Sequence, residues 1–265
     1  MRRPLSAIVL LACLGLLIAG APGHGQPPSG ISRPSFEGGK DEVQLGKELF
    51  AANCASCHGT DGRGVTGPPQ NGAGKVAGLG PSLVGVGAQA ADFYMRTGRM
   101  PLGEPDEQPM RHKPAFSDRE ISALIRYVDS LGSGPPVPRP HPEQGSIAAG
   151  QHMFTEHCAG CHQIVGQGGV VTGAKVPSLE HVSATQVAEA VRIGPYLMPK
   201  FSAHQISDGE LDSLVRYVLS TQDPPDRGGW GIGNIGPIPE GMVTWLLAMV
   251  ALVAVCVLIG KRSES

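Results

Sequence analysis

The sequence has few aromatic residues and almost no net charge, and each shortage narrows the range of functions. Phe, Trp and Tyr make up 5% of the 265 residues, so a small domain formed by this chain has few large side chains for its core. A small domain with so little core needs another source of cohesion. The formal net charge of -2 indicates neither a nucleic-acid partner nor a polybasic contact with a membrane surface.

Cysteine is scarce as well, and its placement is informative. Four of the six cysteines fall in two Cys-x-x-Cys-His pentads, Cys54–His58 and Cys158–His162. Cys13 and Cys256 lie in apolar end segments, where neither has an evident disulfide partner. The pentad is typical of c-type haem attachment, in which two thiols bind the haem vinyl groups and the adjacent imidazole ligates the iron. A structural zinc site is the alternative, but it does not require His directly after each cysteine pair.

The pentads therefore predict two covalently bound haem c groups, whose apolar faces would also supply the missing core. The residues predicted to attach them are Cys54, Cys57, Cys158 and Cys161. The predicted axial ligands from the pentads are His58 and His162. The ligand in the sixth position of each iron then decides function. A second strong ligand closes the iron and restricts the haem to electron transfer, whereas an open position permits oxygen or peroxide chemistry.

Methionine is the residue type that can close both sixth positions. Met100-Pro101 recurs as Met198-Pro199, each after a Gly-containing turn that follows its pentad. A thioether is a neutral, soft ligand that favours Fe(II) and raises the reduction potential. We predict Met100 and Met198 as the second axial ligands, and no separate catalytic residue. Met95 and Met110 are rivals to Met100, although Met95 is expected in the core and Met110 has no counterpart in the second unit.

The surroundings of the pentads repeat as well, which predicts two domains of one fold. Gly46 and Phe50 recur at the same spacing as Gly150 and Phe154. The main difference is an insertion at 102–113, present only in the first unit. This insertion makes the two haem faces different, and we interpret it as adapting them to different partners.

Apolar residues at helical spacing predict a helix from about 40 to Cys54 and further helices over 88–97 and 117–131. The last of these begins with Ser117 and, three residues on, Glu120, which predicts a capping box that recurs at Ser207. His152 and His157 lie on the helix before the second pentad and are expected to be solvated surface side chains.

The two ends of the chain predict a membrane protein. The first residues resemble a secretory signal whose cleavage is open, because Pro22 follows the small-residue site. Residues 242–260 carry no charge and, at 1.5 Å per residue, span roughly 28 Å, close to a hydrocarbon core of about 30 Å. Lys261 and Arg262 follow at once, so the C-terminus is expected in the cytoplasm and the haem domains outside.

The predicted segments are a signal peptide or N-terminal anchor (1–21), a flexible linker (22–39), domain 1 (40–132), a semi-rigid Pro-rich linker (133–145), domain 2 (146–222), a further linker (223–241), a transmembrane helix (242–260) and a cytoplasmic tail (261–265).

Each unit resembles a class I cytochrome c domain, and this resemblance implies an all-α fold in which the first and last helices cross. In that family a Gly and an aromatic residue on the first helix pack against an aromatic residue on the last. The matching residues are Gly46, Phe50 and Tyr127 in the first unit and Gly150, Phe154 and Tyr217 in the second. The family also implies that the carbonyls of Pro81 and Pro177 accept hydrogen bonds from the ring N–H of the axial histidines.

The whole layout resembles a narrower family, the di-haem cytochrome c subunit (cytochrome cc) of the actinobacterial cytochrome bc complex. The local matches are 97–101 (Thr-Gly-Arg-Met-Pro), 198–202 (Met-Pro-Lys-Phe-Ser) and 236–242 (Gly-Pro-Ile-Pro-Glu-Gly-Met). The resemblance implies a subunit of a quinol–cytochrome c reductase with cytochrome b, a Rieske iron–sulfur subunit and a haem-copper terminal oxidase as partners. Two alternatives stay open: the cytochrome c subunit of another terminal oxidase, and a di-haem peroxidase-type enzyme.

Overall fold

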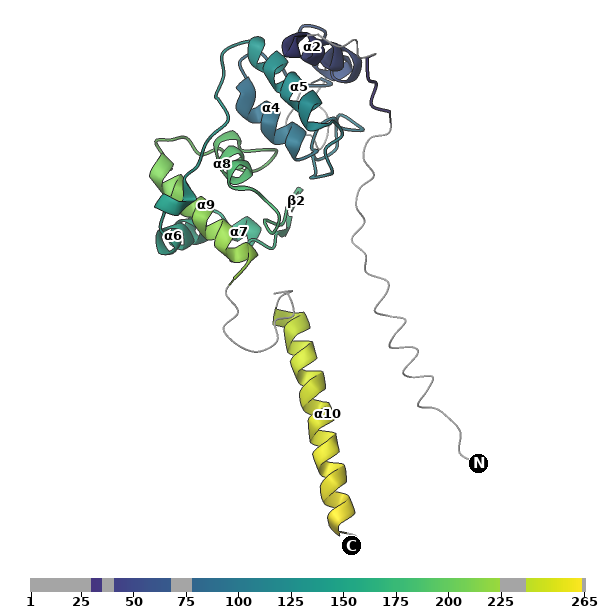
Figure 1. The fold of residues 1–265 in the computed structure, drawn as a ribbon, viewed down its shortest axis with the longest axis vertical. Coiled ribbons are helices and arrows are strands. Elements are labelled where there is room, and N and C mark those ends of the chain that lie inside the picture. The colour runs from purple at the N-terminus through teal and green to yellow at the C-terminus, as the bar shows by residue number, and fades with distance from the viewer. Residues whose placement is uncertain (1–29, 35–40, 68–77, 225–236, 264–265) are drawn as a thin grey trace, which may run out of the picture. The chain divides into compact units, whose positions relative to one another are not determined.

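The structure is a computed structural model that describes residues 30–34, 41–67, 78–224 and 237–263 (Figure 1). The chain divides into two units, Met1–Gln222 and Asp223–Ser265. The predicted N-terminal signal and parts of both flexible linkers lie outside the described residues. The first unit holds two helical domains, and the second holds one long helix.

The first domain is built on the crossing of its first and last helices, α2 (Glu42–Asn53) and α5 (Asp118–Ser130). A Cβ atom at Gly46 would overlap the backbone carbonyl of Ala123, so only glycine permits this close approach. The Phe50 and Tyr127 rings meet one turn further on, with centroids 5.1 Å apart. The contact expected from the resemblance is therefore present.

Two shorter helices complete the first domain. They are α3 (Ala55–His58), a single turn that carries the pentad, and α4 (Gly87–Arg96). The predicted helices over 88–97 and 117–131 correspond to α4 and α5, and Met95 lies in the core as expected.

The second domain repeats this frame. Its first and last helices are α6 (Ile147–His157) and α9 (Asp208–Gln222), which cross at Gly150, where a Cβ atom would overlap the carbonyl of Ser213. The Phe154 and Tyr217 ring centroids lie 5.3 Å apart. The remaining helices are the 3-10 turn η1 (Pro142–Gln144), α7 (Ala159–His162), which carries the pentad, and α8 (Ala184–Ile193).

Helix starts follow the predicted capping chemistry. Ser117 caps α5 and exchanges hydrogen bonds with Glu120, and Ser207 makes the same pair of bonds with Glu210 at the start of α9. These bonds satisfy amide groups that the first helical turn leaves without partners.

A short hairpin is the one departure from a purely helical second domain. Strands β1 (Gly169–Val171) and β2 (Ala174–Val176) pair antiparallel and lie between the pentad and Pro177. The chain between the strands turns at Gly173, which has a φ of 86°. The hairpin could not be predicted from the sequence, because three-residue strands are too short to show a period.

The two domains are in direct contact. Helix α4 of the first packs on α8 of the second (Figure 1). The insertion at 102–113 reaches across, since the Gln108 side chain donates to the backbone carbonyl of Lys175 at 2.7 Å and accepts from its N–H at 2.9 Å. The Pro-rich linker is held at both ends, by Gln89 N–H to the Pro135 carbonyl and by His141 N–H to Asp212.

The second unit contains α10 (Pro237–Ser263), which begins upstream of the expected start at residue 242. Its segment Ile238–Arg262 has a mean hydropathy of 2.8 and, within the described part of the chain, is the one helix long and apolar enough to cross a membrane. Large apolar side chains along it are exposed, and Lys261 and Arg262 occupy its last turn.

Candidate haem sites

Each pentad forms one helical turn that gathers its reactive side chains on one side. In the first, Cys57 N–H and His58 N–H both donate to the carbonyl of Cys54, at 3.1 and 2.9 Å. The corresponding amides of the second pentad donate to the carbonyl of Cys158, also at 3.1 and 2.9 Å. Positions three and four residues apart share a helix face. The two sulfurs and the imidazole of each pentad can therefore meet one ligand.

A proline carbonyl orients the first histidine. The Nδ1 atom of His58 lies 2.8 Å from the carbonyl oxygen of Pro81. A carbonyl oxygen only accepts hydrogen bonds, so the proton of the neutral ring sits on Nδ1 and the Nε2 lone pair is free. This is the arrangement by which proteins prepare an imidazole for a metal.

The second histidine has the same partner in a more enclosed place. The Nδ1 atom of His162 lies 3.3 Å from the carbonyl oxygen of Pro177, and the residue is 9% exposed. Burial lowers the pKa of His162, while the Pro177 carbonyl acts in the opposite direction. The net effect favours the neutral imidazole, which is the form that binds iron.

The pentad cysteines form no disulfide, and their exposure differs: Cys158 is buried, Cys54 and Cys57 are partly buried, and Cys161 is exposed. Burial raises the pKa of Cys54 to about 12, and the neighbouring Cys57 adds to the shift. Burial and Cys161 together raise the pKa of Cys158 to about 11. Among the described residues, no three His, Cys, Asp or Glu side chains gather closely enough to hold a metal ion, which disfavours the zinc alternative.

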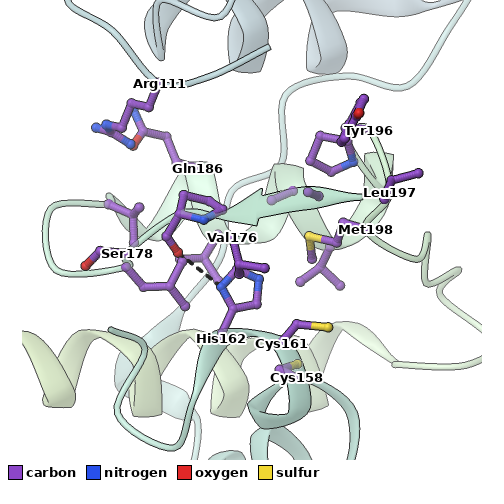
Figure 2. Close-up of a pocket in the computed structure, with 18 of the residues that line it drawn as sticks. Arg111, Cys158, Cys161, His162, Val176, Ser178, Gln186, Tyr196, Leu197 and Met198 are labelled. Carbon is purple, nitrogen blue, oxygen red and sulfur yellow. Dashed lines mark hydrogen bonds between the residues drawn. The ribbon is translucent and has the colours of Figure 1, made fainter. Parts of the chain in front are cut away.

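A deep cleft adjoins the second pentad. It has a cavity volume of about 190 Å³ and is lined mainly by apolar side chains. An apolar lining with a few polar groups is typical of a site that binds a small molecule or a cofactor. Figure 2 shows His162 and Met198 pointing into the cleft, with Cys158 and Cys161 together at one end.

The wall of this cleft includes residues of the first domain. They are Phe93, Arg99, Gln108, Pro109, Met110 and Arg111. The insertion predicted to serve a partner thus lies against the second domain of the same chain.

Arg99 is the most unusual residue of this wall. It is 8% exposed, its Cζ lies 4.8 Å above the Phe93 ring, and its Nη1 atom has no hydrogen-bond partner. Burial, followed by the charge of Arg111, lowers the pKa of Arg99 to about 10, so the guanidinium remains charged at neutral pH. A buried N–H donor without an acceptor costs free energy. The wall therefore fits an occupant that carries acceptor groups, as haem does.

The methionine rivals occupy different environments. Met100 packs against the core of the first domain, and Met95 is part of that core at 9% exposure. Met110 instead lines the cleft of the second domain. Met198 packs at the edge of the second domain's core and lines the same cleft.

The two histidines before the second pentad are both exposed, as expected. His152 is a surface side chain, 75% exposed and paired with Glu156, as predicted. His157 lines the cleft, and its ring centroid lies 6.0 Å from that of Phe201. The side chain of His157 is 48% exposed, so it lies at the edge of the cleft and still faces solvent.

Comparison with known proteins agrees with this geometry. Residues 43–132 match the family described as cytochrome c, and residues 145–218 match the family described as cytochrome c oxidase, cbb3-type, subunit III. Cytochrome c domains bind haem c, so the chain is a haem protein with two domains of this class.

Curated relatives match over most of the chain. The cytochrome bc1 complex cytochrome c subunit of Mycobacterium tuberculosis is 36% identical over 99% of this chain and 93% of the relative. That of Corynebacterium diphtheriae is 34% identical over 83% of this chain and 81% of the relative. A cbb3-type cytochrome c oxidase subunit CcoP of an Azospirillum species is more distant, at 28% identity over 67% of this chain and 65% of the relative. The chain belongs to the family of cytochrome c subunits of the cytochrome bc1 complex.

Proposed function

We propose that this chain relays electrons from the Rieske centre of a menaquinol-oxidising cytochrome bc complex to a haem-copper terminal oxidase. It would do so through two covalently bound haem c groups, one in domain 1 (40–132) and one in domain 2 (146–222). Haem supplies the one-electron chemistry, and the chain supplies attachment, axial ligands and enclosure.

The duplicated histidine geometry carries the proposal. His58 and His162 each give the ring N–H to a proline carbonyl and keep Nε2 free. Cys54 and Cys57 attach the first haem, and Cys158 and Cys161 attach the second. These covalent links fix the edge of each macrocycle beside its histidine.

Methionine closes both irons in this proposal. Met198 points into the second cleft, and Met100 packs against the first core, whereas Met110 lies at the other domain. Met100 is therefore the better candidate for the first iron. Two His/Met sites leave no position for peroxide and suit electron transfer alone.

The membrane helix supports a role inside an assembly. A tethered carrier replaces a diffusing one and raises the effective concentration of each haem at its partners. With Lys261 and Arg262 on the cytoplasmic side, both haem domains would lie on the extracytoplasmic side. The names of the relatives place those proteins in a cytochrome bc1 complex, which supports other subunits of such a complex as neighbours of this chain.

One observation favours a second candidate, the cytochrome c subunit of another terminal oxidase. The second domain matches the cbb3-type subunit III family, and a CcoP protein is a distant relative. The electron-transfer role would be the same, but the electron donor and the assembly would differ.

Extraction in a mild detergent followed by mass spectrometry separates the two candidates. We expect the chain to co-purify with cytochrome b and Rieske subunits and with a haem-copper oxidase. Recovery with an oxidase but without cytochrome b and Rieske subunits would support the second candidate instead. Haem content, measured on the same sample by the pyridine haemochrome method, should be two per chain.

A further inference from the structure

The wall of the second cleft holds a positive charge that nothing in the described structure neutralises. Arg99 is 8% exposed, and its Nη1 atom makes no hydrogen bond. Arg111, beside it, donates only to neutral oxygens, the side-chain oxygen of Gln186 at 3.0 Å and the carbonyl of His181 at 2.9 Å. Among the described residues, no ion pair joins either guanidinium to a carboxylate.

The cleft has a polarity that matches the haem molecule. Cys158 and Cys161 lie at one end of the cleft, and Arg111 lies well away from them toward the opposite end (Figure 2). Haem carries its two vinyl groups on one edge and its two propionate carboxylates on the opposite edge. A haem attached at these cysteines by its vinyl edge would therefore present its propionates toward the first domain.

We propose that Arg99 and Arg111 of the first domain bind the propionates of the haem in the second domain. This inference rests on the proposed attachment of a haem at Cys158 and Cys161. Arginine binds carboxylates through paired N–H donors, and such charge-assisted bonds are strongest where water is excluded. The second haem site is then composite, because its anion-binding wall is supplied by the other domain.

The position of Arg99 in the chain adds a consequence for the relay. Its neighbour Met100 is the proposed ligand of the first iron, while the Arg99 side chain lines the second cleft. One peptide unit thus connects the ligand of one haem with the propionate-binding group of the other. Arg99 is a positioning residue for the second haem rather than a ligand of its iron.

Spectroelectrochemical titration of the full-length holoprotein in detergent tests the proposal. Met198→His, which replaces the sulfur ligand by imidazole and lowers the potential, identifies the component that belongs to the second haem. Arg99→Met removes the charge and keeps much of the side-chain volume. Arg99→Lys keeps the charge, and Arg126→Met is a matched control at a side chain that is 64% exposed.

A nearby cation favours the reduced haem, so Arg99→Met should lower the potential of the second haem. We expect a roughly tenfold loss in its reduction equilibrium constant, about 59 mV for one electron. Arg99→Lys should retain most of the potential, and Arg126→Met should change neither haem. Arg111→Gln, which leaves Arg99 packed on Phe93, should shift the second haem in the same direction by less.

A shift confined to the first haem, or equal shifts in Arg99→Met and Arg99→Lys, would overturn the proposal. So would unchanged potentials in both Arg99→Met and Arg111→Gln. Haem content of the unaltered protein is measured first, and fewer than two haems per chain would contradict the proposed function independently of these variants.

Discussion

The two cytochrome c domains share the helices that carry their pentads and differ in the segments that follow those pentads. In the first domain, the chain makes a long excursion of 23 positions between His58 and Pro81, whose atoms meet at 2.8 Å. In the second, 15 positions separate His162 from Pro177, the contact is 3.3 Å, and a hairpin occupies the interval.

The larger difference lies in where the enclosing residues come from. The cleft of the second domain is lined in part by the first domain's insertion and by Arg99. The pentads and their histidine–proline contacts are thus repeated in both domains, whereas the wall of the second cleft draws on residues of the other domain.

The largest expected effect tests whether the second haem site depends on the first domain while the first haem site does not depend on the second. Gly46→Leu places a side chain against the carbonyl of Ala123 and should unfold the first domain, because overpacking there costs about 3 kcal/mol or more. The second haem should then lose its contacts with the first domain, and its reduction potential should fall. Gly150→Leu should remove the second haem and leave the first unchanged. Haem content and redox titration of each variant measure both effects, and equal disturbance of the partner domain in the two variants would contradict the asymmetry.

The next effect concerns the iron ligands. Met100→Ala and Met198→Ala should each abolish about half of the sulfur-to-iron charge-transfer absorption of the oxidised protein and convert one haem to the high-spin state. Met110→Ala is the matched control and should leave this absorption intact. Loss of the band in Met110→Ala, with retention in Met100→Ala, would reassign the first ligand to Met110.

The contact between the domains should make stability depend on pH. Glu189 on α8 is fully buried against Asp92 on α4, and Asp92 is paired with Arg96 at 2.7 Å. Burial, followed by the charge of Asp92, raises the pKa of Glu189 from 4.5 to about 9. The protonated form is therefore favoured in the folded chain.

A carboxyl group with a raised pKa stabilises the fold fully below pH 4.5 and loses this contribution as pH rises toward 9. We expect the free energy of unfolding to fall between pH 5 and pH 9. Glu189→Gln, which keeps the shape and a hydrogen-bond donor, should flatten this fall. Denaturant unfolding at several pH values measures it, and parallel curves for the two proteins would rule out Glu189 as the cause.

The smallest expected effect is a difference in unfolding free energy between the tyrosines at the two helix crossings. The hydroxyl of Tyr217 donates to the carbonyl of Ile164 at 2.7 Å, next to the second pentad. Tyr217→Phe should cost about 1 kcal/mol of unfolding free energy, the usual net value of one hydrogen bond. Tyr127→Phe in the first domain is the comparison and should cost less. Thermal unfolding followed at the haem absorption measures both, and a larger loss in Tyr127→Phe would reverse the comparison.

The frame of each domain could be predicted from the sequence because its signals are local. The capping pair at Ser117, the apolar spacing before Cys54 and the glycine at position 46 each act over a few residues or through a recurring helix contact. The same holds for the pentads, where one helical turn brings the ligands together. Such features depend on residues that are close in the sequence, so the sequence alone predicts them.

The contact between domains could not be predicted in the same way. The bonds of Gln108 to Lys175 and of Arg111 to Gln186 join positions 67 and 75 residues apart, and no local pattern marks them. The insertion was visible in the sequence, but its polar residues suit a partner protein as well as a neighbouring domain. Only the packing of α4 on α8 decides between the two.

The place of Arg99 next to Met100 has a consequence for recombining these domains. The boundary suggested by the repeat, in the Pro-rich linker, would separate the second pentad from residues that line its cleft. A chimaera cut there would carry the second haem with a wall from a foreign first domain. The unit of exchange for the second site therefore includes 99–111, so its evolutionary and engineering module is discontinuous in the sequence.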